Sequence, residues 1–145
     1  MIENAEEFLT LRRSANPDEY RRAAHDAAPL EVWLTIIATY PEMRHWVAHN
    51  KTVPIEVFGK LAHDPDEHVR WMVATKRKLS RELFDLLAAD RNETVRARIA
   101  LNRNAPQTVV ERLAGDEWVV VRSAACEQLE RRGGGPGSLS EGSAE

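Results

Sequence analysis

The segment LAHDPDEHVRWM, at residues 61–72, is followed by two segments of the same pattern, LAADRNETVRAR at 87–98 and LAGDEWVVVRSA at 113–124. Each begins with Leu-Ala, has Asp at its fourth position and has Val-Arg at its ninth and tenth. The interval is constant, because 87 − 61 = 26 and 113 − 87 = 26. Arg44 extends the arginine column one interval upstream of Arg70, since 70 − 44 = 26. A repeat of about 20 to 50 residues is typical of solenoids, in which each unit buries its apolar face only against its neighbours.

Each repeat has the pattern of two short helices. Helices of this length do not persist alone in water, because nucleation is costly, so we expect them to be stabilised by packing. The expected helices are 3–14, a second that begins at Asn16, then 29–38 with 42–50, 54–63 with 66–76, 80–89 with 92–102, and 106–115 with 117–132. The sequence thus predicts an all-α solenoid of about five antiparallel helix pairs over 1–132 and a flexible Gly/Ser-rich tail, GGGPGSLSEGSAE, over 133–145.

Polar residues at the expected helix starts predict the caps. Asn16 precedes Pro17, which is the common order of a capping residue and a proline at the first helical position. Asp64 and Asp90 each stand three residues before a Glu, as in a capping box. We therefore expect these two aspartates to cap the second helices of their repeats.

Composition narrows the class of protein. The chain has 145 residues, 43% of them hydrophobic, a formal net charge of −3 and a pI near 6.0. A negative chain does not favour nucleic acid as a partner. It contains one cysteine, Cys126, and neither a basic and apolar leader nor a stretch of about 20 apolar residues. We expect a cytoplasmic protein without a membrane span and without a cofactor.

The repeated residues resemble two neighbouring families of helical repeat. The Asp and Val-Arg positions are similar to those of HEAT repeats, and the run VAHN…P…LAHDPD…VR over 47–70 resembles the bacterial leucine-rich repeat variant still more closely. The resemblance implies a right-handed superhelix, a binding role, and a hydrogen-bonded ladder along the stack made by Asp64, Arg70, Asp90, Arg96, Asp116 and Arg122. Some members of the variant family carry an iron–sulfur centre on an N-terminal cysteine cluster, which this sequence lacks.

The arginine column has two interpretations. It is a phosphate-binding stripe if the guanidinium groups of Arg44, Arg70, Arg96 and Arg122 face solvent. It is structural if each pairs with a carboxylate or a turn carbonyl within the stack. A helical wheel centred on Val69 places Arg70 at the edge of the core, which favours the structural interpretation.

The same wheel predicts a partner-binding surface. Trp71 and Thr75 lie on the side of their helix that faces away from Val69. The resemblance places the second helices on the concave surface, so their columns would supply His45, His49, Leu101, Trp71 and Thr75, with His68 and Arg98 at the border. An exposed Trp among polar groups is typical of a binding hot spot. The alternative is that Trp71 packs over a neighbouring helix.

A basic edge is a second candidate surface. Its residues leave the second helices and are Lys76, Arg77, Lys78, Arg81 and Arg103. Basic residues at helix C-termini also complement the helix dipole, which explains them without a partner. His45 and His49 stand at i and i+4, which suits a shared metal, but such pairs are common on surfaces and we expect no metal site.

No arrangement in the sequence indicates catalysis. Cys126 continues the column of Ala48, Ala74 and Ala100, so we expect it to be buried as a small residue. The favoured hypothesis is a non-enzymatic module that binds a protein partner through its concave face. An immunity or antitoxin-like inhibitor of a toxin is one version of it. The alternative from another class is a nucleic-acid-binding or DNA-glycosylase-like HEAT-repeat protein.

Overall fold

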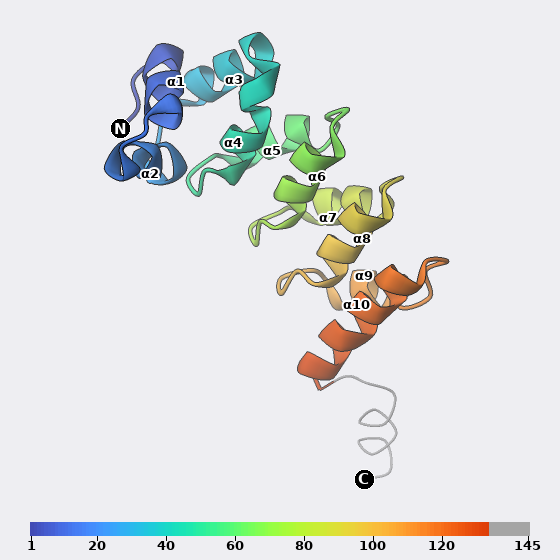
Figure 1. Ribbon diagram of the computed structural model, residues 1–145. Coiled ribbons are helices and arrows are strands. Elements are labelled where there is room, and N and C mark those ends of the chain that lie inside the picture. The colour runs from blue at the N-terminus through green and yellow to red at the C-terminus, as the bar shows by residue number, and fades with distance from the viewer. Residues whose placement is uncertain (134–145) are drawn as a thin grey trace, which may run out of the picture. The chain divides into compact units, whose positions relative to one another are not determined.

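The computed structural model describes residues 1–133, which form ten α-helices, one 3₁₀ turn and no strand (Figure 1). The prediction of an all-α fold is therefore confirmed. The helices group into two compact units, Met1–Val73 and a second unit that starts at Ala74. Residues 134–145, where we predict most of the flexible tail, lie outside the described residues.

Every helix that the sequence predicts is present, and most are shorter than expected because their end residues form turns. The first unit contains α1 (Ala5–Arg13), α2 (Pro17–His25), α3 (Leu30–Thr39), η1 (Pro41–Met43), α4 (Arg44–His49), α5 (Ile55–Leu61) and nearly all of α6 (Glu67–Ala74). The second unit contains α7 (Arg81–Ala88), α8 (Glu93–Ala100), α9 (Gln107–Leu113) and α10 (Val119–Arg131). None of the helices in residues 1–133 combines the length and the apolar character that a membrane span needs.

The residue that caps the helix is the predicted one in α2 and a different one in α8. The side chain of Asn16 accepts the N–H of Asp18 and caps α2, as predicted. Asp90 does not cap α8, because Asn92 holds that position and accepts the N–H groups of Thr94 and Val95. The carboxylate of Asp90 instead accepts the N–H of Asn92 in the turn before the helix.

Asp64 behaves in the same way as Asp90. Its Oδ1 accepts the N–H of Asp66, and Asp66 in turn accepts the N–H of His68. The prediction that the Asp column caps the second helices is therefore wrong by two residues. The physical reason is that an Asp two residues before the cap closes the turn: Oδ1 of Asp64 accepts the N–H of Asp66, and its Oδ2 accepts from Arg44.

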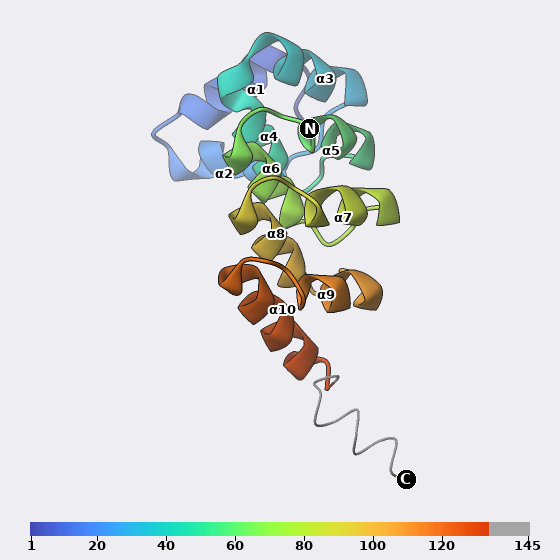
Figure 2. The same cartoon turned by 90° about the vertical axis from the view of Figure 1, so that its right-hand side faces the viewer.

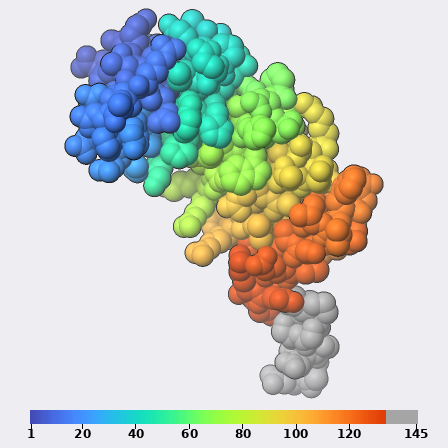
Figure 3. Space-filling view, in the orientation of Figure 1, coloured from blue at the N-terminus to red at the C-terminus, as the bar shows by residue number. Residues whose placement is uncertain are grey.

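The core of the first unit is built around one aromatic pair. Trp33 of α3 and Phe8 of α1 are both fully buried, and their rings meet edge to face with centroids 5.5 Å apart. Ile36 of α3 and Val47 of α4 are also fully buried. Figure 3 shows the outer face of the helices, beneath which these buried side chains lie. The short helices are therefore stabilised by their packing.

In the second unit, α8 packs against α7, α9 and α10 (Figure 2). Val95, Ile99 and Ala100 of α8 have no exposed surface. The cysteine of the same column, Cys126, is exposed, which contradicts the expectation that it is buried. Within residues 1–133 no further helix follows α10 to cover it.

Candidate functional site

The arginine column is engaged within the protein itself. In the second unit Arg96 donates from Nε and Nη2 to the two carboxylate oxygens of Asp116, at 2.9 and 3.2 Å, and from Nη1 to the carbonyl of Asp90 at 2.7 Å. Arg122 repeats the last contact one interval later, donating to the carbonyl of Asp116 at 2.8 Å. Arg96 is 8% exposed, so it is not available as a phosphate contact.

The first unit contains the same two contacts. Arg44 donates to Oδ2 of Asp64 at 3.2 Å and to the carbonyl of Ile37 at 2.7 Å. Arg70, which is 3% exposed, donates to the carbonyl of Asp64 at 2.7 Å. These distances support the structural interpretation of the column, in which each guanidinium ties a turn to a helix.

Two aspartates, Asp116 and Asp66, have a lowered pKa. Burial alone would raise the pKa of Asp116, but hydrogen bonds from Arg96 and from the N–H of Trp118, with the charges of Arg96 and Arg122, lower it below its ordinary value. Asp66 has a lowered pKa mainly because its carboxylate accepts the backbone N–H of His68. Both carboxylates accept hydrogen bonds from the protein itself, Asp66 from the N–H of His68 and Asp116 from Arg96.

A hollow in the second unit brings together part of the predicted surface. Its volume is about 300 Å³, and it is lined by Thr75, Arg77, Arg98, Leu101, Asn102, Arg103 and Arg131. Three of these come from the predicted partner surface and two from the predicted basic edge. Sequence analysis did not identify Arg131, because this residue lies in the part of α10 that extends past the repeated segments.

Two asparagines position the arginines of this basic hollow. The side-chain nitrogen of Asn102, which is 2% exposed, donates to the carbonyls of Ala74 and Lys76 at 2.9 and 2.7 Å. Asn104 donates to the carbonyl of Arg77 at 3.0 Å. The segment that follows α8 is thereby fastened to the segment before α7. Because these two segments are held together, Arg77 of one and Arg103 of the other both line the hollow.

The charges of the basic hollow are only partly compensated. Of its four arginines, Arg131 pairs with Glu127 at 2.6 Å. The guanidinium groups of Arg77 and Arg103 make no hydrogen bond or ion pair with any other residue in 1–133. Arg98 is half-buried, and this burial lowers its pKa, since desolvation disfavours the charged form. No Asp or Glu is among the lining residues, so the hollow suits an anionic group.

The predicted basic edge is divided by the structure. Arg81 does not line the basic hollow, because its Nη2 donates to the hydroxyl of Thr108 at 2.9 Å and its Nε pairs with Asp85 at 3.3 Å. Lys76 is half-buried and Lys78 is exposed, and neither lines the hollow. Arg77 and Arg103 are the two members of the edge that do.

The remaining candidates of the partner surface belong to the first unit. Trp71 is 38% exposed, and His68 is exposed with its Nδ1 at 3.1 Å from Asp66. The rings of His45 and His49 are nearly perpendicular to the ring of Trp46, and their centroids lie 5.1 and 5.9 Å from its centroid. Trp46 was missed in the sequence, because its own column continues with Met72, Arg98 and Ala124 and so shows no aromatic pattern.

No group of three or more His, Cys, Asp or Glu side chains within residues 1–133 is placed to hold a metal ion. Comparisons of the chain with protein-family models, with curated proteins and with solved structures find no significant match. The resemblance to HEAT repeats and to the leucine-rich repeat variant therefore stays a prediction.

Proposed function

We propose that the protein is a non-enzymatic interaction module, an α-solenoid of 26-residue repeats, whose second unit binds an acidic segment of a protein partner. The observation that carries this proposal is the basic hollow, where four arginines converge without a lining carboxylate. Acidic side chains match such a site because guanidinium groups form paired, charge-assisted hydrogen bonds with carboxylates.

The recurrence of contacts supports the repeat interpretation. An arginine bonds the carbonyl of the aspartate six residues before it in three cases, since 70 − 64, 96 − 90 and 122 − 116 are all 6. An arginine bonds the carboxylate of the aspartate twenty residues after it in two cases, since 64 − 44 and 116 − 96 are both 20. The arginines that line the hollow, Arg77, Arg98, Arg103 and Arg131, do not belong to the arginine column.

Size and charge favour a peptide segment over nucleic acid. A hollow of about 300 Å³ is at the lower end of small-molecule sites and holds one or two side chains, not a duplex groove. The formal net charge of −3 also opposes long-range attraction of a polyanion. The binding of a short acidic segment depends only on the positive charge within the hollow.

The test is fluorescence anisotropy with a labelled oligo-glutamate peptide, at low and at physiological salt. We expect the Arg77→Gln/Arg103→Gln variant to bind at least about tenfold more weakly than the wild type, because two charge-assisted contacts are lost. The matched control is Arg81→Gln/Arg112→Gln, which removes two arginines of the same unit that lie outside the hollow. It should bind within about twofold of the wild type.

Three results would count against the proposal. The first is a wild type that does not bind the peptide, and the second is an equal loss in both double variants, which would indicate a nonspecific charge effect. The third is tighter binding of a DNA duplex, with a steep salt dependence, which would favour the nucleic-acid alternative. Far-UV circular dichroism checks that each variant is folded.

A further inference from the structure

A smaller hollow in the first unit is separate from the site proposed above and shares no residue with it. Its volume is about 280 Å³, and it is lined by Arg12, Tyr20, Arg21, Ala23, Ala24, Trp46 and His49. These residues come from α1, α2 and α4, and α1 and α4 each pack against α2 (Figure 1). We name it the aromatic hollow.

An arginine is stacked on an aromatic ring in this hollow. The guanidinium carbon of Arg12 lies 3.5 Å from the ring centroid of Trp46 and 5.8 Å from that of Tyr20. Contact at this distance fixes the plane of the guanidinium through cation–π attraction. Trp46 is itself supported edge-on by His45 and His49. Arg12 is therefore ordered before any ligand arrives, which reduces the entropy lost on binding.

Stacking satisfies the faces of the guanidinium but not its N–H groups. Arg12 is half-buried, yet within residues 1–133 its side chain has no hydrogen bond and no ion pair. The adjacent Arg13, which points elsewhere, pairs with Glu42 at 3.9 Å. The aromatic hollow is also lined by Arg21, whose Nη1 pairs with Asp18 at 3.5 Å, and no carboxylate is among the lining residues. A ligand that accepts hydrogen bonds would satisfy these partly buried N–H groups of Arg12.

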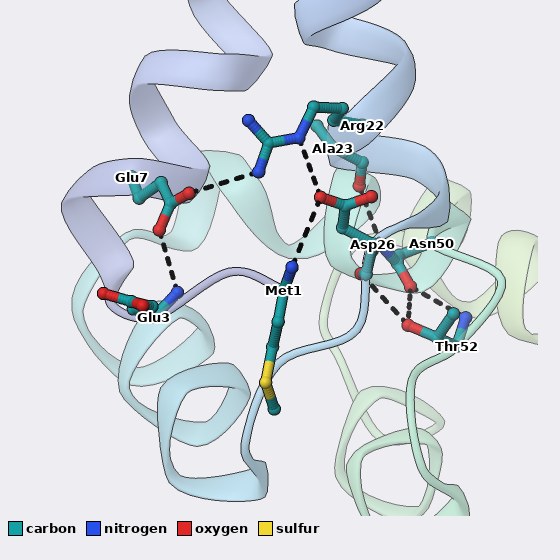
Figure 4. Close-up of polar contacts among 8 residues, drawn as sticks. All are labelled: Met1, Glu3, Glu7, Arg22, Ala23, Asp26, Asn50 and Thr52. Atoms are coloured by element: carbon teal, nitrogen blue, oxygen red, sulfur yellow. Dashed lines mark hydrogen bonds and ion pairs between the residues drawn. The ribbon is translucent and has the colours of Figure 1, made fainter.

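The wall of the aromatic hollow is held in place by an independent polar network (Figure 4). The side chain of Asn50, which is fully buried, donates to the carbonyls of Ala23 and Asp26 at 2.8 and 3.0 Å. Arg22 bridges the carboxylates of Asp26 and Glu7 at 2.8 and 3.3 Å, and hydrogen bonding to Asp26 raises its pKa. The end of α2 is thereby fixed to α1 and to the loop after α4, so the hollow does not depend on a ligand for its shape.

We propose that the aromatic hollow binds an oxyanion, a carboxylate or a phosphate group, between the N–H groups of Arg12 and the side chain of Arg21. The part of the ligand next to the oxyanion would pack against the rings of Trp46 and Tyr20, which form an apolar and aromatic wall. This site stands independently of the acidic-segment site in the second unit, and neither proposal needs the other.

The experiment follows the indole N–H signals and the arginine Nε–H signals of ¹⁵N-labelled protein during titration with inorganic phosphate and, separately, with acetate. Sodium chloride keeps the ionic strength constant. We expect the signals of Trp46 and Arg12 to shift and saturate. The indole signal of Trp33, which is fully buried in the core, should not move and reports that the fold is intact.

Variants locate the site. Arg12→Gln should weaken the response at least about tenfold, because the charged donor is lost. Arg12→Lys should weaken it several-fold, since an ammonium keeps the charge but neither stacks nor donates as a planar fork. Arg13→Gln is the matched control and should bind as the wild type does. If Arg12→Gln disturbs the Trp33 signal, Arg21→Gln takes its place.

The two titrations also identify the source of the oxyanion. Saturation by phosphate alone supports a phosphate-bearing ligand, and saturation by acetate supports a carboxylate-bearing one. The proposal is overturned if neither anion gives a saturable shift at Trp46, or if the shift is the same in Arg12→Gln or in Arg12→Lys as in the wild type.

Discussion

Replacing Asp116 by Asn tests whether the paired carboxylate holds the second unit together. The change keeps the size of the side chain and removes its charge. Arg96 then loses the charged, bidentate acceptor at 2.9 and 3.2 Å, and its remaining acceptors are the carbonyl of Asp90 at 2.7 Å and the neutral amide oxygen of the new Asn. The two paired side chains are about 10% and 11% exposed, so the arginine charge is left buried and only partly satisfied.

The size of the effect follows from this geometry. Removing one partner of a buried ion pair costs about 3 to 5 kcal/mol. We expect about 3 kcal/mol here, the lower end of this range, because Arg96 still donates to the carbonyl of Asp90 and can donate to the amide oxygen of the new Asn. Asp64→Asn is the comparison in the first unit. Its pair with Arg44 has one contact at 3.2 Å, and Arg44 is 27% exposed, so we expect about 1 kcal/mol.

The pH dependence gives a second readout. The folded pKa of Asp116 is lowered, so the carboxylate stabilises the fold above its unfolded pKa of about 4, and this stabilisation is lost as the pH falls through the folded pKa. Asn does not titrate. The stability gap between the wild type and Asp116→Asn should therefore be constant at neutral pH and narrow below about pH 4.

Urea unfolding followed by circular dichroism at 222 nm, between pH 7 and pH 3, measures both effects. With an ordinary dependence on urea, about 3 kcal/mol lowers the midpoint by about 1 to 2 M. A loss below about 0.5 kcal/mol at pH 7 would refute the reasoning, as would a gap that does not change with pH.

Two further predictions concern stability, and the same unfolding assay measures both. Asn102→Ala should lower the free energy of unfolding by about 2 to 3 kcal/mol, because it leaves the carbonyls of Ala74 and Lys76 without the donor that they now have. Gln128→Met, 26 residues later in the same column, should change it by less than about 0.5 kcal/mol, since the buried amide nitrogen of Gln128 has no partner within residues 1–133. An equal loss of stability in both variants would contradict this explanation. Gly59→Ala should stabilise the protein by about 0.5 to 1 kcal/mol, because Gly59 lies inside α5 and a Cβ there meets no atom within 4 Å. A lower unfolding midpoint in this variant would show that the added methyl group clashes with its surroundings.

The sequence pattern predicted the all-α fold and the approximate positions of the helices. Helix positions, the proline and serine residues before α5, α7 and α9, and the internal use of the arginine column all follow from it. Such features depend on residues close in sequence or at a fixed interval. Such features can therefore be predicted from the spacing of residues in the sequence. The caps at Asp64 and Asp90 were predicted wrongly because two polar residues compete for one helix start, and only the backbone geometry decides between them.

The candidate sites were predicted only in part. The sequence indicated Thr75, Arg98 and Leu101 through their columns, but it separated them from Arg77 and Arg103, and it omitted Arg131. The hollow forms because Asn102 and Asn104 fasten two loops that are more than 20 residues apart in the chain. No local pattern encodes that approach.

By itself, the sequence determined which residues form helices, which faces are apolar and which arginines stand at a fixed interval, because these properties arise from local periodicity and hydrogen bonding. Only the tertiary structure decided which side chains meet. The stacking of Arg12 on Trp46 joins two helices outside the regular register, and the exposure of Cys126 depends on whether a following helix covers α10. Both are results of packing between elements, which depends on the shapes of both surfaces and not on the spacing within either one.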